Sequence, residues 1–160
     1  MEYRNEAPPV GLGTLLRALL AQLEPAVELA YTKCDPLMRS RYYPVMRALL
    51  SERQATVGEI AQAVGVSQPA MTQTIRQMVQ DDLLEVELGE DRRARLVTLS
   101  ERGMEAVANL RPVWAAVSEA SATLAADADI DLVTTLERAL AALGEKDFAA
   151  RIADAQGDTK

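Results

Sequence analysis

Histidine is absent from this chain of 160 residues, and Cys34 is its only cysteine. Without histidine the chain cannot form a Ser-His or Cys-His catalytic pair, or a zinc site with an imidazole ligand. A single cysteine also excludes an internal disulfide and a metal site made of cysteines alone. We therefore expect no metal and no other cofactor. Carboxylate chemistry stays open, but no pair of acidic residues stands out, so an enzyme is the least favoured class.

Long apolar runs are also missing. No segment is long enough to span a bilayer, and residues 1–10 do not form a basic and then apolar leader. We therefore expect no membrane partner and a cytoplasmic location, where a lone cysteine stays reduced. The length fits one ordinary domain with helical extensions, which can bury enough surface to fold without disulfides or metals.

The net charge of −7 is unevenly distributed along the chain. Residues 38–103 contain nine basic and nine acidic residues, whereas residues 104–160 contain five basic and ten acidic residues. The negative charge is therefore concentrated near the C-terminus. Nucleic-acid binding needs a local basic face rather than a basic chain, so the middle segment keeps this function open.

Helical patterns rich in leucine and alanine occupy both ends of the chain. The first begins at Leu12, and Pro25 within it predicts a kink or a restart. The others follow Ser100, an expected N-cap, and we expect Pro112 to bend the first of them and Asp129 to cap the last. Their apolar stripes must pack on each other, on a second copy, or both. Homodimerisation through these helices is the more economical solution.

Two short helices joined by a tight turn are predicted between Thr56 and Gln80. Thr56 and Glu59 have the spacing of a capping box, and Gly65 stands where a helix needs a left-handed terminator. Ser67 follows two residues later as the N-cap of the next helix. Two helices joined so closely must cross at a steep angle, as in a helix-turn-helix.

The second of these helices, Gln68–Gln80, is expected to have an outward face free of acidic residues. A period of 3.6 residues places on its inward side Met71, Ile75 and Met78. The residues on the opposite side are Pro69, Thr72, Gln73, Arg76 and Gln80. Glutamine can pair with adenine and arginine with guanine, while Ser67 or Thr72 could donate to phosphate near the helix N-terminus. A merely solvated face is the alternative, but such faces usually carry Lys and Glu, so DNA binding is favoured.

A β-hairpin is predicted directly after this helix. Apolar and acidic residues alternate in Leu84–Leu88, residues 89–91 have turn chemistry, and Arg95–Leu99 forms the returning strand. Arginines near its tip, Arg92, Arg93 and Arg95, suit insertion into a minor groove. A hydrated charged turn is the stronger interpretation for the tip alone. Next to the helix-turn-helix, however, the hairpin completes the outline of a winged helix, and DNA contact becomes the better interpretation.

The segments VGVSQPAMTQTIRQM and DRRARLVTLSERG resemble the multiple-antibiotic-resistance-regulator (MarR) family of bacterial transcription factors. The resemblance covers about residues 40–105, and the second segment is the more specific. It implies a mainly α fold with a small β-hairpin wing, a winged helix-turn-helix with N- and C-terminal dimerisation helices. We expect an N-terminal dimerisation helix with a loose lead-in in 1–37, the winged helix-turn-helix DNA-binding domain in 38–103, and C-terminal dimerisation helices in 104–160.

The same resemblance implies a homodimer that binds a pseudo-palindromic operator in double-stranded DNA, usually as a repressor. It also implies that small ligands release this homodimer from the DNA. Carried over residue by residue, the DNA contacts fall on Gln68, Thr72, Gln73, Arg76, Arg92, Arg93 and Arg95. Two residues depart from the family pattern. Asp82 stands where relatives usually have glycine, and Val86 stands where many have arginine, which predicts fewer phosphate contacts.

Three further expectations concern ligands and partners. A pocket for a small aromatic ligand is expected from Tyr42, Tyr43, Met46 and Trp114, although such residues at helical spacing more often form core. One branch of the family senses peroxide through a cysteine nearer the start of the first helix, so Cys34 is expected to be a plain packed or surface thiol. The alternative to a DNA-binding regulator is a winged-helix protein-interaction module, which the acidic balance permits.

Overall fold

The structure is a computed structural model that describes residues 9–88 and 95–157. Its helices are α1 (Leu12–Cys34), the 3-10 helix η1 (Ser40–Tyr42), α2 (Tyr43–Glu52), α3 (Val57–Val64), α4 (Gln68–Gln80), α5 (Glu101–Asp127), α6 (Leu132–Glu145) and α7 (Phe148–Gln156). Its strands are β1 (Gln54–Thr56), β2 (Leu84–Leu88) and β3 (Arg95–Leu99). The chain divides into two units, Met1–Trp114 and Ala115–Lys160, and α5 runs from the first into the second.

The helix-turn-helix is α3 and α4, and its ends form as the sequence predicts. Thr56 Oγ1 accepts the backbone N–H of Glu59, whose carboxylate accepts the N–H of Thr56 in return, so the capping box is complete. Gly65 ends α3 with φ at 77°, in the left-handed region. Ser67 Oγ then caps α4 by accepting the N–H of Ala70 at 3.4 Å.

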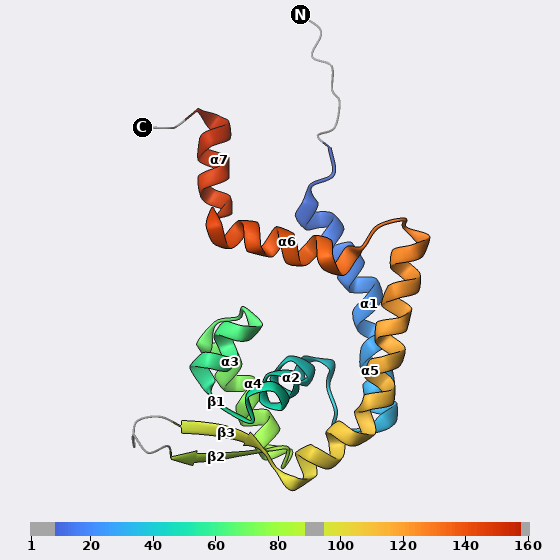
Figure 1. Cartoon of the computed structure of the whole chain (residues 1–160), viewed down its shortest axis with the longest axis vertical. Coiled ribbons are helices and arrows are strands. Elements are labelled where there is room, and N and C mark those ends of the chain that lie inside the picture. The colour runs from blue at the N-terminus through green and yellow to red at the C-terminus, as the bar shows by residue number, and fades with distance from the viewer. Residues whose placement is uncertain (1–8, 89–94, 158–160) are drawn as a thin grey trace, which may run out of the picture. The chain divides into compact units, whose positions relative to one another are not determined.

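The sheet has three antiparallel strands in the order β1-β3-β2, so the wing strand β2 is an edge strand. The predicted strands Leu84–Leu88 and Arg95–Leu99 are confirmed, with Leu84 opposite Leu99 and Leu88 opposite Arg95. Strand β1 was not predicted, because three residues are too few for a visible alternation and its partner β3 lies 40 residues away. Figure 1 shows β2 and β3 extending away from the helices of this unit.

The core of the first unit lies between the sheet and helices α2, α3, α4 and α5. Met71, Ile75 and Met78 of α4 are buried in it, as their spacing predicts. They pack in one cluster with the apolar side chains Tyr31, Met38, Tyr42, Val45, Met46, Leu49, Ile60, Leu83, Val97, Val107 and Leu110. This core holds α4 by one face only and leaves its opposite face available.

The prolines in the long helices are accommodated without a break. Helix α1 continues through Pro25 and does not restart there. Proline lacks an N–H, so the carbonyl of Ala21 loses its helical partner, but Ala21 is exposed and water can replace it. Pro112 likewise lies inside α5.

The described part of the second unit consists of the end of α5 and the helices α6 and α7. Asp129 does not cap α6, contrary to expectation, because its φ of 53° places it in the left-handed turn that follows α5. Asp131 is the N-cap instead, and its Oδ1 accepts the N–H of Thr134 at 3.0 Å. Asp147 caps α7 by accepting the N–H of Ala150 at 2.7 Å. Phe148 and Ile152 both lie in α7.

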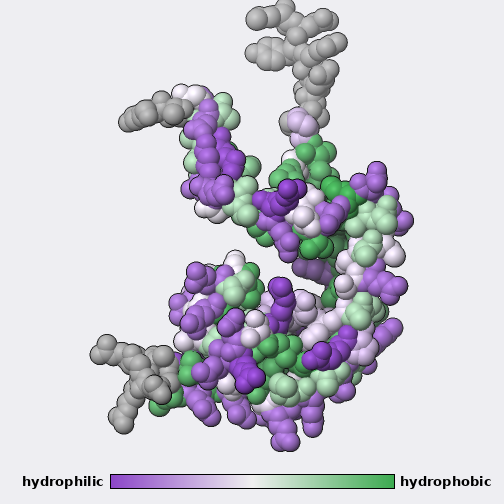
Figure 2. Space-filling view, in the orientation of Figure 1, coloured by the Kyte–Doolittle hydropathy of each residue, from purple (hydrophilic) through white to green (hydrophobic). Residues whose placement is uncertain are grey.

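Large apolar side chains stay exposed on the helices at both ends of the chain. No residue of α6 or of α7 is buried within the described part of the second unit. The exposed residues include Leu12, Leu15, Leu20, Leu23 and Leu29 in α1, and Val133, Leu136, Leu140, Leu143, Phe148 and Ile152 in α6 and α7. Figure 2 shows apolar surface at the beginning of α1 and mixed surface along α6. None of the helices in residues 9–88 and 95–157 is long and apolar enough to cross a membrane.

Candidate nucleic-acid interface

The outer face of α4 carries polar side chains on a helix that its buried face holds in place. Gln68, Gln73 and Arg76 are exposed, and Thr72 is half-buried. Because Met71, Ile75 and Met78 anchor the other side, the outer face is presented at a fixed rotation about the helix axis. This is the geometry that a helix needs to bring side chains to the edges of bases.

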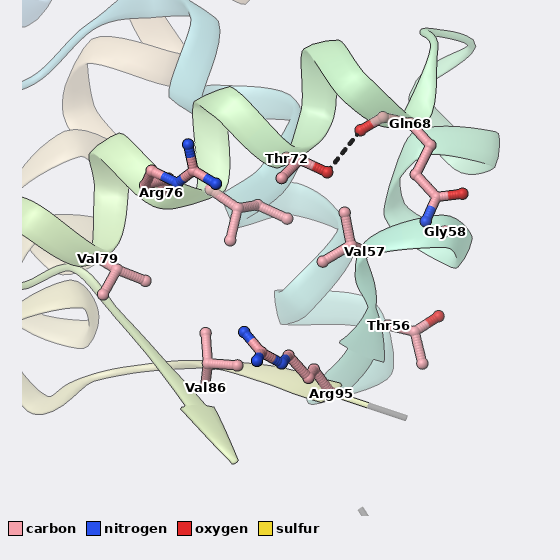
Figure 3. A pocket seen from close by; sticks show the side chains of 10 residues that line it. Thr56, Val57, Gly58, Gln68, Thr72, Arg76, Val79, Val86 and Arg95 are labelled. Atoms are coloured by element: carbon pink, nitrogen blue, oxygen red, sulfur yellow. Dashed lines mark hydrogen bonds between the residues drawn. The ribbon is translucent and has the colours of Figure 1, made fainter. Parts of the chain in front are cut away.

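The hydroxyl groups of Thr72 in α4 and of Ser67, its N-cap, differ in what they can still donate. Thr72 Oγ1 donates to the carbonyl oxygen of Gln68 at 2.8 Å, as the dashed line in Figure 3 shows. Its hydrogen is therefore engaged, and its methyl group and the two lone pairs of its oxygen stay available. Ser67 Oγ accepts the N–H of Ala70 and keeps its own hydrogen for another acceptor. Of the two hydroxyls, Ser67 is the better donor to a phosphate at the N-terminus of α4.

A groove of about 630 Å³ lies between α4, the N-terminus of α3 and the strands β2 and β3. We call it the wing groove; its lining residues are Thr56, Val57, Gly58, Gln68, Thr72, Ile75, Arg76, Val79, Val86 and Arg95. None of these is acidic, and two are arginines. In Figure 3, Arg76 comes from the helix side of the groove and Arg95 from the strand side, with Val57, Val79 and Val86 around the space between them. The wing groove thus combines two cations with an apolar floor.

The wing has two unlike faces. Side chains alternate along a strand, and Val86 lines the wing groove, so the flanking Glu85 and Glu87 point to the opposite side of β2. Val86, at the position where many relatives are expected to have arginine, is 40% exposed. Arg92 and Arg93, the other two arginines expected to contact DNA, lie outside the described residues, as does the predicted turn at 89–91.

The four residues expected to form a ligand pocket separate into two pairs. Tyr42 and Met46 are 1% and 0% exposed and belong to the packed core. Tyr43 and Trp114 meet edge to face, with ring centroids 5.3 Å apart. The indole Nε1 of Trp114 is buried and has no hydrogen-bond partner within the described residues. Of the four residues, only Trp114 therefore has a side-chain N–H without a partner in hydrogen-bond geometry, and this N–H is close enough to the hydroxyl of Tyr31 to act on the pKa of that group.

Tyr31 of α1 packs in the core cluster against which Trp114 of this aromatic pair also packs, although it was not predicted as a pocket residue. It is buried in the same core, and burial raises the pKa of its hydroxyl to about 12. Its position one turn after Val27, on the inward stripe of α1, is the signal that could have identified it. Cys34, at the end of the same helix, is exposed, and its Sγ donates to the carbonyl oxygen of Asn109 in α5 at 3.4 Å.

Helices α2 to α4 with the sheet and its β2–β3 extension define a winged helix-turn-helix. Residues 38–94, which contain most of this winged helix, match the model of the MarR family. A comparison with curated proteins gives no significant match.

Solved structures share the fold over most of the chain. The M. tuberculosis transcriptional regulator MOSR, in complex with DNA, is similar with a TM-score of 0.71 and 22% identity, covering 89% of this chain and 99% of that one. A mutant E. coli MarR complexed with operator DNA gives a TM-score of 0.66 and 18% identity, covering 82% and 92%. Bordetella bronchiseptica BpsR, whose DNA binding is regulated by 6-hydroxynicotinic acid, gives 0.55 and 20%, covering 71% and 84%.

Proposed function

We propose that this protein is a transcriptional regulator that binds double-stranded DNA through α4 and the wing. The observation that carries the proposal is the wing groove, where none of the described lining residues is acidic and where Arg76 and Arg95 lie on opposite walls. The chain is acidic as a whole, so an acid-free groove beside an exposed polar helix face is a specific local feature. Similar folds solved with DNA, in MOSR and MarR, support the same conclusion.

The positions of the side chains suggest which residues contact bases and which contact phosphates. Gln68 and Gln73, exposed on α4, contact base edges in the major groove. Arg76 lines the wing groove together with Arg95, so we assign both to the phosphate strand that passes between helix and wing. This changes the role of Arg76 from the base contact considered in the sequence analysis. Arg92 and Arg93 extend the wing contacts into the minor groove, and Ser67 donates to a phosphate.

We further propose that two copies bind together. Residues 1–37 and 104–160 supply the dimerisation helices, and 38–103 the DNA-binding domain. The support is the exposed leucine-rich surface of α1, α6 and α7, which a folded chain would cover against a partner. A symmetric dimer reads a pseudo-palindrome, so its two α4 helices are about 34 Å apart on one face of the duplex.

Release by a small aromatic ligand completes the proposal of a repressor. Tyr43 and Trp114 offer aromatic surface, and the unpartnered Nε1–H of Trp114 can donate to a carboxylate or hydroxyl oxygen. The ligand regulation of BpsR by an aromatic acid, in a protein of similar fold, supports this chemistry. A thermal-shift screen of small aromatic acids tests it, since a bound ligand raises the unfolding temperature of wild-type protein more than that of Trp114→Phe, which lacks the donor.

The DNA-binding experiment begins with selection of a duplex from a random pool by wild-type protein. Binding to the selected duplex is then measured by fluorescence anisotropy for wild type, Arg76→Ala, Arg95→Ala and Arg47→Ala. Arg47 is exposed on α2 outside the wing groove and is the matched control. Weaker binding by the first two variants, with the control unchanged, is the expected result. A winged helix used only for protein contacts would enrich no duplex and would keep its function in all three variants.

A further inference from the structure

We propose that Asp81 and Arg102 form a positioning pair that sets the orientation of α4 for DNA binding without touching DNA. The inference rests on the proposed function, because it concerns how the DNA-reading helix is held. Neither residue lines the wing groove. They lie at the other end of α4, where it meets η1, α5 and the connection that follows α1.

Asp81 is the C-cap of α4 and is bonded on three sides. Its Oδ2 accepts the hydroxyl of Tyr42 at 2.8 Å, and its Oδ1 accepts the side-chain amide of Gln77 at 3.2 Å. Its backbone carbonyl accepts the guanidinium of Arg102. The carboxylate therefore joins α4 to η1, and the carbonyl joins α4 to α5.

Tyr42 gives this arrangement its rigidity. Its side chain is 1% exposed and is surrounded by the core, and only its hydroxyl reaches Asp81. A buried hydroxyl needs a partner, and among the described residues Asp81 is the one it has. The core thus fixes where the carboxylate of Asp81 lies, and the carboxylate fixes the last turn of α4.

Arg102 connects the same turn to α1. Its second nitrogen lies 3.5 Å from Oδ2 of Asp35, the C-cap of α1. Asp35 is itself held, since its Oδ1 accepts the N–H of Leu37 at 2.9 Å. One guanidinium therefore contacts the ends of α1 and α4 from the first turn of α5.

The chain after Asp81 cannot absorb a shift between α4 and α5. Ser100 Oγ donates to the carbonyl of Asp82 at 2.6 Å and accepts the N–H of Gly103 at 2.9 Å. The N–H of Ser100 donates to the carbonyl of Leu83 at 3.1 Å. A movement of α5 or α1 at this point is passed to α4, and with it to the outer face that carries Gln73 and Arg76.

The test uses the duplex selected by wild-type protein and the variants Asp81→Ala, Asp81→Asn and Tyr42→Phe. Removal of an acidic side chain near DNA strengthens binding if only charge matters. A positioning role gives the opposite sign: Asp81→Ala and Tyr42→Phe each weaken binding about fivefold or more. The double variant Asp81→Ala with Tyr42→Phe binds DNA no more weakly than either single variant, because both substitutions break the same contact. Asp81→Asn keeps an acceptor for Tyr42 and recovers most of the affinity.

The salt dependence of binding separates positioning from direct contact. Arg102→Ala is expected to weaken binding with the salt slope unchanged, whereas loss of a phosphate contact lowers the slope by about one. Unchanged or tighter binding by both Asp81→Ala and Tyr42→Phe overturns the inference, as does a lowered slope in Arg102→Ala. If Asp81→Ala does not fold, Tyr42→Phe and Asp81→Asn decide alone. Failure of wild-type protein to select any duplex contradicts the proposed function itself.

Discussion

Arg76 of α4 and Arg95 of β3 line the same groove, one from the helix wall and one from the strand wall. They are far apart in the sequence, and the sheet brings them together because β3 pairs with β2, which follows α4 directly. The described lining residues between them include Val57, Val79 and Val86 and no carboxylate, so the groove offers apolar surface to sugar and base edges. The wing groove is therefore shaped for a polyanion that also has apolar parts, as a DNA strand does.

The exposed Gln73 is expected to affect which sequences bind rather than how strongly all DNA binds. For duplexes that keep the base pair read by Gln73, Gln73→Ala should weaken the binding free energy by about 1–3 kcal/mol. For duplexes in which that base pair has been replaced, the variant should bind as tightly as wild type. Anisotropy titrations over single-base variants of the selected duplex measure this. An equal loss on every duplex would show that Gln73 does not read a base.

Gly103 allows the close approach of α5 to the connection between α4 and β2. A Cβ at this position would lie 2.1 Å from the carbonyl oxygen of Leu83, which is backbone and cannot rotate away. Gly103→Ala should therefore lower the free energy of unfolding by about 3 kcal/mol or more. Gly144→Ala is the control, since nothing lies within 4 Å and it stands within α6, where alanine should add about 0.5–1 kcal/mol. Urea unfolding of both variants measures the difference; equal stabilities would contradict the close contact.

Asp82 has a φ of 59°, so the position usually held by glycine in the family keeps a left-handed backbone here. Aspartate tolerates this region better than most residues, and β-branched residues tolerate it least. Asp82→Gly should leave the free energy of unfolding within about 1 kcal/mol of wild type, and Asp82→Val should lower it by about 1–2 kcal/mol. If Asp82→Val unfolds at the wild-type urea midpoint, the backbone there is not left-handed.

Glu28 links α1 to η1, and its protonation should weaken the fold. Burial acts to raise its pKa, but the N–H of Ser40, 2.8 Å from Oε2, and the charges of Arg39 and Arg41 outweigh this, so the pKa is lowered. A lowered carboxyl pKa stabilises the fold above the ordinary value of about 4.3 and loses that contribution as the pH falls below it.

Unfolding free energies from pH 7 to pH 3 test this in Glu28→Gln and in Glu24→Gln, a control about one turn earlier in α1. The Glu28→Gln variant should be less stable at pH 7, and its stability should fall less between pH 5 and pH 3 than that of wild type. Parallel pH profiles for wild type and Glu28→Gln would contradict the assigned role.

Features decided by neighbours in the sequence were predictable. The capping box at Thr56, the left-handed Gly65 and the strand Leu84–Leu88 depend on residues a few positions apart, and the structure confirms each, although Leu84 alone is buried in that strand. Asp129 shows the limit of this reasoning, since two aspartates stand near the start of α6 and only backbone conformation selects Asp131.

Features decided by distant contacts were not predictable. Strand β1 forms because it pairs with β3, and its three residues are too few to show an alternating pattern. The contacts of Asp81 with Tyr42 and Arg102 join residues 39 and 21 positions apart. Tyr42 and Met46 are residue types that also line ligand pockets, at a spacing that fits both pocket and core. Only the packing of the structure shows that both side chains belong to the core.

The measurement that tests the central claim most directly is the salt dependence of binding to the selected duplex by wild type, Arg76→Ala, Arg95→Ala and the control Arg47→Ala. Loss of one phosphate contact reduces the slope of log affinity against log salt by about one. The account predicts such a reduction for each groove variant and none for Arg47→Ala. Unchanged slopes in both groove variants, or binding by wild type that does not depend on salt, would contradict it.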